Sequence, residues 1–173
     1  MVIALTGHVK IEKALSLPVV DETLRTYNEE AYEIAKKDIF NALKKEIPNI
    51  ENEDVIFVSG MARGGDEIFA DIAIELNKKL ILCVPNSIKW HKRQKKSAIK
   101  YDEILQYNKV EVREIKKDYN GGNYHFGYLA RNQAMVDLID DEGFLLAFYR
   151  YNSSGVLNTI KRAEEANKKI VKI

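Results

Sequence analysis

The sequence has little cysteine, no long apolar run and almost no net charge, and each shortage excludes a class of protein. Its one cysteine, Cys83, cannot form an internal disulfide and stands in the apolar run Leu80–Val84, which indicates a buried thiol and a reducing compartment. No apolar stretch approaches the roughly 20 residues that span a bilayer. Met1–Thr6 lacks the basic lead of a signal peptide. We therefore expect a cytoplasmic protein without a membrane partner.

Charge provides no general attraction to polyanions. The formal net charge is +1, from 27 lysines and arginines against 26 aspartates and glutamates, so nucleic acid is an unlikely partner on global charge alone. Hydrophobic residues make up 46% of the chain, which is typical of a folded globular protein. The 173 residues contain no internal repeat and no low-complexity linker, and we expect residues 1–173 to form a single domain.

Short apolar runs alternate with helical periodicity. Apolar positions at helical spacing predict helices near residues 31–47, 68–76, 128–139 and 156–166, and a shorter one within 97–107. Alternating apolar and charged residues favour an edge strand at Val110–Ile115. The predicted strands are Val2–Thr6, Val55–Ser59, Leu80–Val84, Val110–Ile115, Gly143–Tyr149 and Ile170–Ile173. The fold class is therefore α/β, a three-layer Rossmann-like fold with a mostly parallel sheet and helices on both faces.

Candidate ligand residues gather where the predicted strands end, because ligands of open parallel sheets bind beyond the carboxyl ends of the strands. Ser59–Asp66 and Asn152–Thr159 are small-residue turns that lead into helices. Glycine lets a backbone approach a ligand closely, and a helix N-terminus attracts phosphate or carboxylate. Irregular segments 9–26, 86–96 and 116–127 are candidate loops or lids. The candidate ligand-binding residues are Gly7, His8, Ser59, Gly60, Met61, Ala62, Arg63, Gly64, Asp66, Pro85, Arg131, Asn132, Ser154, Gly155, Asn158 and Thr159.

Three charged candidates have structural alternatives. Arg63 is placed to clamp an anion or a base, or else it is a surface arginine or pairs with Asp66 or Glu67. Asp66 is either a helix cap or a contact to ribose hydroxyls. Arg131 lies on a helical pattern whose polar residues would ordinarily face solvent.

Other chemistry has little support. The three histidines lack metal-ligand spacing, so we expect no bound metal, and no cofactor is indicated. Neither glycine-rich turn is a Walker loop or a dinucleotide fingerprint, and no pair of acids stands out as a catalytic couple. Segment Lys89–Lys100 is basic and without acids, which is typical of a solvated face or of a phosphate or nucleic-acid patch. Trp90 within it is either a stacking surface or an anchor, and we favour the anchor.

Four motifs in order resemble one known superfamily. Thr6-Gly7-His8 ends the first strand, Ser59–Asp66 reads Ser-Gly-Met-Ala-Arg-Gly-Gly-Asp, and Arg131–Asp137 reads Arg-Asn-Gln-Ala-Met-Val-Asp. With Trp90 and Tyr101 between them and a small-residue turn near the end, these motifs resemble the SLOG superfamily. This superfamily is named after DNA-processing protein A and the Lonely-guy cytokinin-activating enzymes, and the resemblance is strongest to its small bacterial and phage members. It covers nearly the whole chain.

The resemblance implies a Rossmann-like domain that binds a nucleotide or nucleoside derivative as a small-molecule partner. Relatives include phosphoribohydrolases, nucleotide sensors and single-strand DNA binders, and many of them pair, which implies a possible homodimer. The exposed-looking aromatics Tyr124, Phe126 and Tyr128 pack either at such an interface or internally. Val156 replaces the usual threonine of the last turn, and Glu164 and Glu165 lie too far along for the hydrolase glutamate. Whether the chain is an enzyme stays open. The resemblance implies that the site is lined by Arg63, Gly64, Asp66, Arg131, Asn132, Gly155, Asn158 and Thr159.

Overall fold

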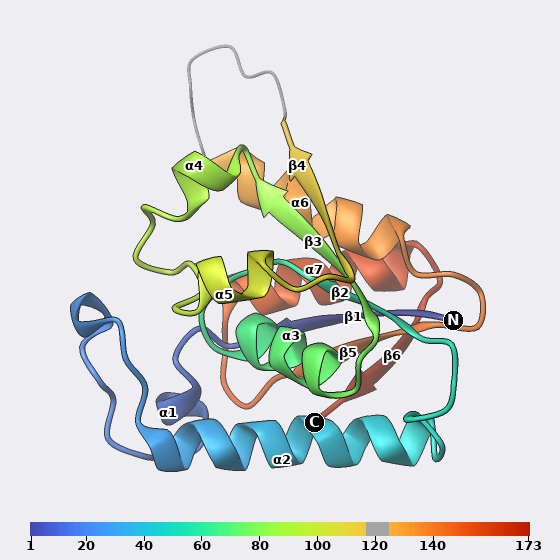
Figure 1. Ribbon diagram of the computed structural model, residues 1–173, viewed down its shortest axis with the longest axis horizontal. Coiled ribbons are helices and arrows are strands. Elements are labelled where there is room, and N and C mark those ends of the chain that lie inside the picture. Colours follow the sequence, from blue (N-terminus) through green and yellow to red (C-terminus); the bar gives the residue numbers. More distant parts are fainter. Residues whose placement is uncertain (117–124) are drawn as a thin grey trace.

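The computed structural model describes residues 1–116 and 125–173, and these form a six-stranded sheet with helices on both faces (Figure 1). The strands lie in the order β4-β3-β2-β1-β5-β6, and each pairing between them is parallel. This confirms the predicted α/β, Rossmann-like fold. The strands are β1 (Val2–Gly7), β2 (Ile56–Ser59), β3 (Lys79–Pro85), β4 (Val110–Ile115), β5 (Phe144–Phe148) and β6 (Lys169–Lys172).

The long helices lie where the apolar periodicity predicts them. The helix expected within 97–107 is shorter, and segments 9–26 and 86–96, expected to be irregular, contain short helices. Helices of a single turn carry too few periodic positions to be seen in a sequence. The third irregular segment, 116–127, falls mostly outside the described residues. The helices are α1 (Ile11–Ala14), η1 (Glu22–Leu24, a 3-10 turn), α2 (Glu29–Glu46), α3 (Gly65–Glu75), α4 (Ile88–His91), α5 (Tyr101–Leu105), α6 (His125–Asp137) and α7 (Ser154–Glu165).

The sheet separates two apolar cores. On one face α2, α3 and α5 cover it, with Ile39 and Phe69 among the buried side chains. On the other face α6 and α7 pack through residues such as Val136 and Ile160 (Figure 1). Cys83 belongs to this second core, and burial raises the pKa of its thiol to about 11, so the expectation of a buried thiol is confirmed.

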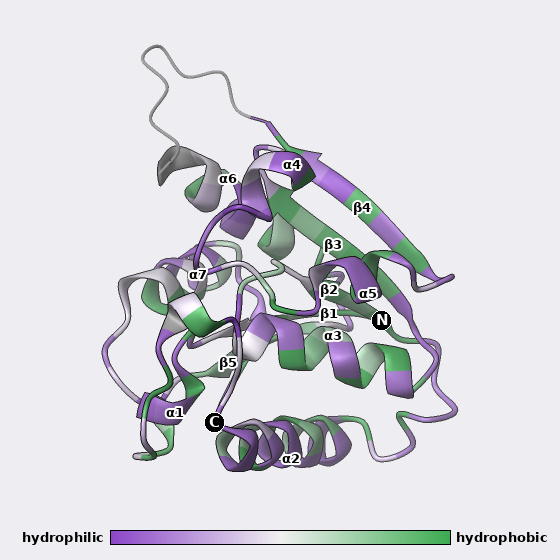
Figure 2. Cartoon of the chain, turned by 60° about the vertical axis from the view of Figure 1, so that its left-hand side comes forward, coloured by the Kyte–Doolittle hydropathy of each residue, from purple (hydrophilic) through white to green (hydrophobic). Residues whose placement is uncertain are grey.

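Strands of uniformly apolar sequence lie inside the sheet, and the strand of alternating sequence lies at its edge. All residues of β3 from Leu80 onward are buried, because helices cover both of its faces. β4 lies at the edge of the sheet, beside β3, and its residues alternate between hydrophobic and hydrophilic (Figure 2). The predicted edge strand is therefore confirmed.

The strand order reverses between β1 and β5, and this reversal positions the candidate site. From β1 the sheet continues through β2, β3 and β4 in one direction and through β5 and β6 in the other. The chain leaves β1 toward α1 and α2 on one face, and leaves β5 toward α7 on the opposite face. Diverging connections of this kind open a crevice at the carboxyl ends of the two strands.

Candidate functional site

The turn after β2 is held by its own side chains. Ser59 Oγ donates a hydrogen bond to the carbonyl oxygen of Asp66 (2.8 Å) and accepts one from the N–H of Met61 (3.2 Å). The Asp66 carboxylate accepts from the N–H of Ala62 (3.3 Å). The N-cap of α3 is Gly64. The interpretation of Asp66 as a helix cap is therefore wrong, because Asp66 braces the preceding turn instead. Met61 adopts a left-handed φ of 56° and buries its side chain in the core.

Glycines in this region serve the close approach of two backbone segments. Gly64 has φ 85°, and a Cβ there would collide with the carbonyl oxygen of His8 and lie 2.8 Å from that of Val9. The N–H of Gly65 donates to the His8 carbonyl (3.1 Å). A Cβ at Gly7 would lie 3.0 Å from the Cα of Gly65. The end of β1 and the turn after β2 are thus fastened together, and this packing accounts for the glycines without any ligand.

Arg131 reaches the same turn from α6. Its side chain donates through Nη1 to the carbonyl oxygen of Gly60, and Nη1 lies 3.4 Å from the Asp66 carboxylate. A Cβ at Gly60 would overlap this guanidinium. Arg131 is only 8% exposed, so the interpretation of an exposed polar helix face is wrong. The structure brings Arg131 and Asp66 together, as the resemblance implied.

A chain of amide contacts continues from Arg131 to α7. Arg131 Nε donates to Asn132 Oδ1 (2.9 Å), and Asn132 Nδ2 donates to Asn158 Oδ1 (3.2 Å). Asn158 Oδ1 also accepts from Arg162 Nε (2.9 Å). Thr159 is buried and donates to the carbonyl oxygen of Gly155 within its own helix (3.2 Å). Residues from three distant stretches of sequence therefore form one polar network across the strand ends.

The N-terminus of α7 is accessible. Its N-cap, Ser153, makes no side-chain capping hydrogen bond, and Ser154 and Gly155 are exposed. A Cβ at Gly155 would meet no atom of the described chain within 4 Å. The first-turn N–H groups of a helix lack intrahelical partners and carry partial positive charge, so this turn is suited to an anion. Val156 faces inward and is buried in the second core.

His8 fastens the loop between β5 and α7. Its Nε2 accepts from the N–H groups of Arg150 (2.8 Å) and Tyr151 (3.3 Å), so the proton of the neutral ring lies on Nδ1. The ring stacks on Tyr151 with centroids 3.8 Å apart. Desolvation, assisted by Lys13 and Arg150, lowers the pKa of His8 to about 4. His8 is therefore a neutral anchor of the loop that leads to α7.

Asp66 is the carboxylate of this network whose pKa is shifted. Burial raises its pKa to about 6, although Arg131 and the N–H groups of Ala62 and Gly60 favour the ionised form. Glu164 and Glu165, considered above as distant candidates for a hydrolase glutamate, are exposed in the last turn of α7.

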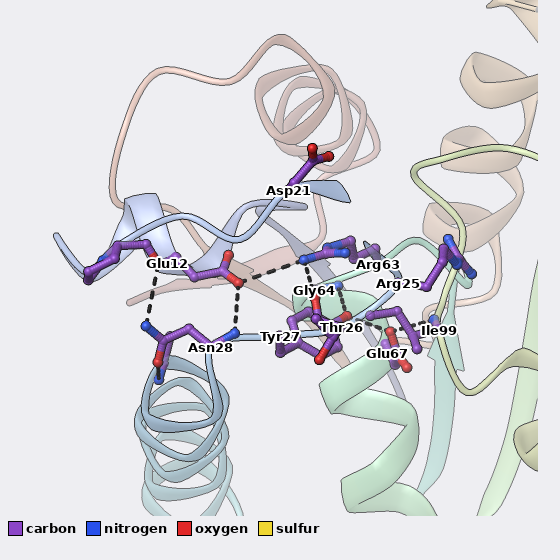
Figure 3. A network of polar contacts seen from close by, with 12 residues as sticks. Glu12, Asp21, Arg25, Thr26, Tyr27, Asn28, Arg63, Gly64, Glu67 and Ile99 are labelled. Atoms are coloured by element: carbon purple, nitrogen blue, oxygen red, sulfur yellow. Dashed lines mark hydrogen bonds and ion pairs between the residues drawn. The ribbon is translucent and has the colours of Figure 1, made fainter. Parts of the chain in front are cut away.

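Arg63 is placed differently from Arg131. It is 1% exposed, and its Nη2 donates to the carbonyl oxygen of Thr26 (2.7 Å) and lies 3.7 Å from Glu12 Oε1 (Figure 3). Its guanidinium sits over the Tyr27 ring, 4.7 Å from the centroid. These contacts belong to the segment before α2, whereas Arg131 belongs to α6 on the other face of the sheet. The two arginines therefore do not converge on one position.

Both alternatives considered for Arg63 are wrong, because it is neither a surface arginine nor a partner of Asp66 or Glu67. Its acidic partner is Glu12, which lies 51 positions earlier in the chain, and no local spacing rule connects the two residues. A sequence cannot reveal such a pair, because the strand order alone brings the two segments together.

Sequence reasoning missed a buried aromatic cluster beside Arg131. His91 is fully buried, and its Nδ1 lies 3.1 Å from the Tyr101 hydroxyl. The Tyr128 ring packs edge-on against His91 and Trp90, with centroids 6.1 and 5.6 Å away. Trp90 thus anchors its loop, as we favoured. The only available signal was the Trp and Tyr of the superfamily resemblance, which did not include His91.

The aromatics suggested for a homodimer lend it little support. Tyr128 packs internally against this cluster. Tyr124 and the side chain of Phe126 lie outside the described residues. A homodimer therefore stays a prediction. Pro85 ends β3 and is buried at the same edge of the sheet.

The basic segment lies directly beside the turn after β2. The N–H of Arg63 donates to the carbonyl oxygen of Lys96 (2.7 Å), and the N–H of Ala98 donates to that of Met61 (2.9 Å). Its exposed cations are Lys89, Lys92, Arg93, Lys95 and Lys96. Positive charge is therefore concentrated next to the candidate site despite the near-neutral total.

The described residues contain neither a cluster of metal ligands nor a membrane-spanning helix. Within residues 1–116 and 125–173, no group of three or more His, Cys, Asp or Glu side chains is arranged to hold a metal ion. None of the helices in these ranges combines the length and the apolar character needed to cross a membrane.

Comparison with known proteins agrees with the architecture. The model of the family described as DNA recombination-mediator protein A matches residues 33–173. Among solved structures, the chain is similar to DNA processing protein A (DprA) from Streptococcus pneumoniae, with a TM-score of 0.61 and 18% sequence identity. The match covers 98% of this chain and 49% of the other, so the chain spans about half the length of that relative. No curated protein matches. At this identity, the structural likeness shows the fold.

Proposed function

Since the chain belongs to the DNA recombination-mediator protein A family, and with it to the SLOG superfamily that its motifs resemble, we propose that it binds a nucleotide at the carboxyl ends of its strands. The observation that carries the proposal is the network led by buried Arg131, which joins the turn after β2 to α7 through Asn132 and Asn158. Burying the Arg131 and Asp66 charges of this network costs desolvation free energy, and a role in ligand binding would explain why the charges are kept there.

The first turn of α7 is the proposed phosphate position. Ser154 and Gly155 are exposed there, Ser153 makes no side-chain capping hydrogen bond, and the space above Gly155 is open as far as the described residues extend. Asn158 lies about one helical turn beyond Ser154 and would offer its amide to a ribose hydroxyl, whereas Asp66 connects to α7 only through Arg131 and Asn132. Because the nearest acids of α7 are Glu164 and Glu165 in its last turn, we propose binding and not cleavage of the N-glycosidic bond.

Calorimetry against nucleoside mono- and diphosphates and cyclic nucleotides tests the proposal. Asn158→Asp keeps the Oδ1 acceptor that Asn132 and Arg162 use, but it adds a negative charge beside the phosphate position. We expect affinity to fall by about tenfold or more. Asn167→Asp, which adds the same charge at the other end of α7, is the matched control. Absence of binding by all these nucleotides, or equal weakening by both variants, would refute the proposal.

A second candidate is single-stranded DNA, favoured by the exposed cations of the basic segment and by the DNA-related description of the family. This description weighs against our expectation that nucleic acid is an unlikely partner. Fluorescence anisotropy with an oligothymidine over a range of salt concentrations tests it. Binding that weakens with salt and with Lys95→Glu/Lys96→Glu is expected, because each phosphate contact releases counterions. Undetectable or salt-insensitive binding would exclude it.

A further inference from the structure

The ion pair of Arg63 and Glu12 is incompletely satisfied although both side chains are buried. Their exposed fractions are 1% and 0%, and the Nη2–Oε1 distance of 3.7 Å is long for a charge-assisted hydrogen bond. Among the described residues, Nε and Nη1 of Arg63 and Oε2 of Glu12 have no hydrogen-bond partner. Buried polar groups in folded proteins are nearly all hydrogen-bonded. Two donor atoms of Arg63 are therefore available to an anion, and one oxygen of Glu12 lacks a donor.

The chain between α1 and α2 covers this pair. Residues 11–28, which we name the cover segment, contact Arg63 through Glu12, Thr26 and Tyr27 (Figure 3). The Tyr27 hydroxyl accepts from the N–H of Gly64 (2.6 Å) and donates to Glu67 (2.5 Å). Polar contacts thus join this end of the cover segment to the turn after β2, whereas its other end is held in the core by Ile11 and Leu15. Polar contacts of this kind can exchange with a competing ligand.

We propose that Arg63 is an anion-binding residue whose ligand position Glu12 occupies, and that a phosphate-bearing ligand displaces the Glu12 carboxylate. A guanidinium keeps its charge and binds carboxylate and phosphate with similar geometry, so the internal carboxylate stands in for a phosphate. The proposal rests on the proposed function only in assuming that the phosphate group belongs to a bound nucleotide. The position itself is separate from the one beside Arg131.

A purely structural ion pair would behave in the opposite way. Removing one partner of such a pair leaves an uncompensated buried charge, which destabilises the fold and creates no affinity. If Glu12 is instead an internal competitor, removing its charge frees Arg63 for an external anion. Only the second interpretation therefore predicts a gain in anion affinity.

Glu12→Gln tests the proposal, with inorganic pyrophosphate as the probe in calorimetry. Glutamine keeps an oxygen for the N–H of Asn28, which donates to Glu12 Oε1 (3.2 Å). We expect pyrophosphate to bind Glu12→Gln at least about tenfold more tightly than it binds the unchanged chain. Adding Arg63→Lys to this variant should remove the gain. Glu75→Gln, which breaks the ion pair with Lys36 on α2, is the matched control and should leave affinity unchanged. Equal or weaker binding by Glu12→Gln would overturn the proposal.

Hydrogen exchange of the unchanged chain provides a test that does not depend on the variant folding. Saturating pyrophosphate should speed amide exchange within the cover segment, because its contacts to Arg63 are lost. Unchanged or slower exchange there would overturn the proposal. Combining Asn158→Asp with Glu12→Gln distinguishes the two sites. If nucleotide binding is lost but the gain in pyrophosphate affinity remains, the inference about Arg63 is supported and the proposed function is not. If nucleotide binds but pyrophosphate affinity does not rise, the proposed function is supported and the inference about Arg63 is refuted.

Discussion

Gly155→Asp should separate ligand binding from folding. The residue is the second of α7 and is exposed, and a side chain there meets no described atom within 4 Å. An acid in the first turn of a helix stabilises it by about 0.3–1 kcal/mol through the macrodipole, and replacing glycine adds a few tenths of a kcal/mol, roughly, of helix propensity. The folded state should therefore gain about 1 kcal/mol, which for a chain of this length raises Tm by about 2–4 °C.

The same substitution should weaken nucleotide binding. A carboxylate about 5 Å from a phosphate repels it by about 2–3 kcal/mol at an effective dielectric constant of roughly 20–30. The dissociation constant for the tightest-binding nucleotide should rise by about 30-fold or more. Stability and affinity thus change in opposite directions, which general damage to the protein cannot produce.

Differential scanning fluorimetry and calorimetry at low salt measure the two effects. Gly155→Ala is the matched control, because it fills the same space with a methyl group and adds no charge, so its affinity should fall much less. A folded Gly155→Asp that binds nucleotide as tightly as the unchanged chain would refute the phosphate position. A large fall in Tm would refute the reasoning that the space above Gly155 is open.

Three further results are expected. Gly64→Ala should lower the free energy of unfolding by about 2 kcal/mol or more in urea titrations, because φ is 85° and a Cβ would strike the His8 carbonyl; near-unchanged stability would contradict this close approach. Tyr27→Phe should cost about 1–3 kcal/mol, since the hydroxyl links the N–H of Gly64 to a carboxylate on α3; an unchanged urea midpoint would argue against that link. Stability should also fall by about 2–3 kcal/mol from pH 6.5 to 4.5. Burial lowers the pKa of His8 to about 4 and of His91 to about 3, so the unfolded chain takes up protons that the folded chain refuses, while Asp66, with its pKa raised to about 6, offsets part of the loss. Urea midpoints that stay constant over this range would contradict the burial of these histidines.

Local pattern was sufficient to predict most of the fold. The runs at β1, β3 and β5 are apolar because helices cover both faces of those strands, and the alternation in β4 follows from its place at the edge. Each signal depends only on neighbours within one element, so it is legible without the tertiary structure. Short helices such as α4 were missed because one turn has no period.

The candidate site was predicted in part. Glycine turns and the Arg131 motif pointed to the strand ends at which the structure joins Arg131 to Asp66. The sequence could not reveal that Arg63 turns away, or that His91 lies buried beside α6. Those outcomes depend on which segments the strand order brings into contact.

The sequence by itself therefore determined the α/β class, the positions of the strands and the family motifs, since these are recorded in residue periodicity and in consecutive residues. Only the tertiary structure decided which charges meet. The pairing of Arg63 with Glu12, and of Arg131 with Gly60 and Asp66, joins residues that are far apart along the chain. Whether an arginine ends in solvent, against a carboxylate or beside a ligand depends on the packing of whole helices around it, and no local pattern encodes that packing.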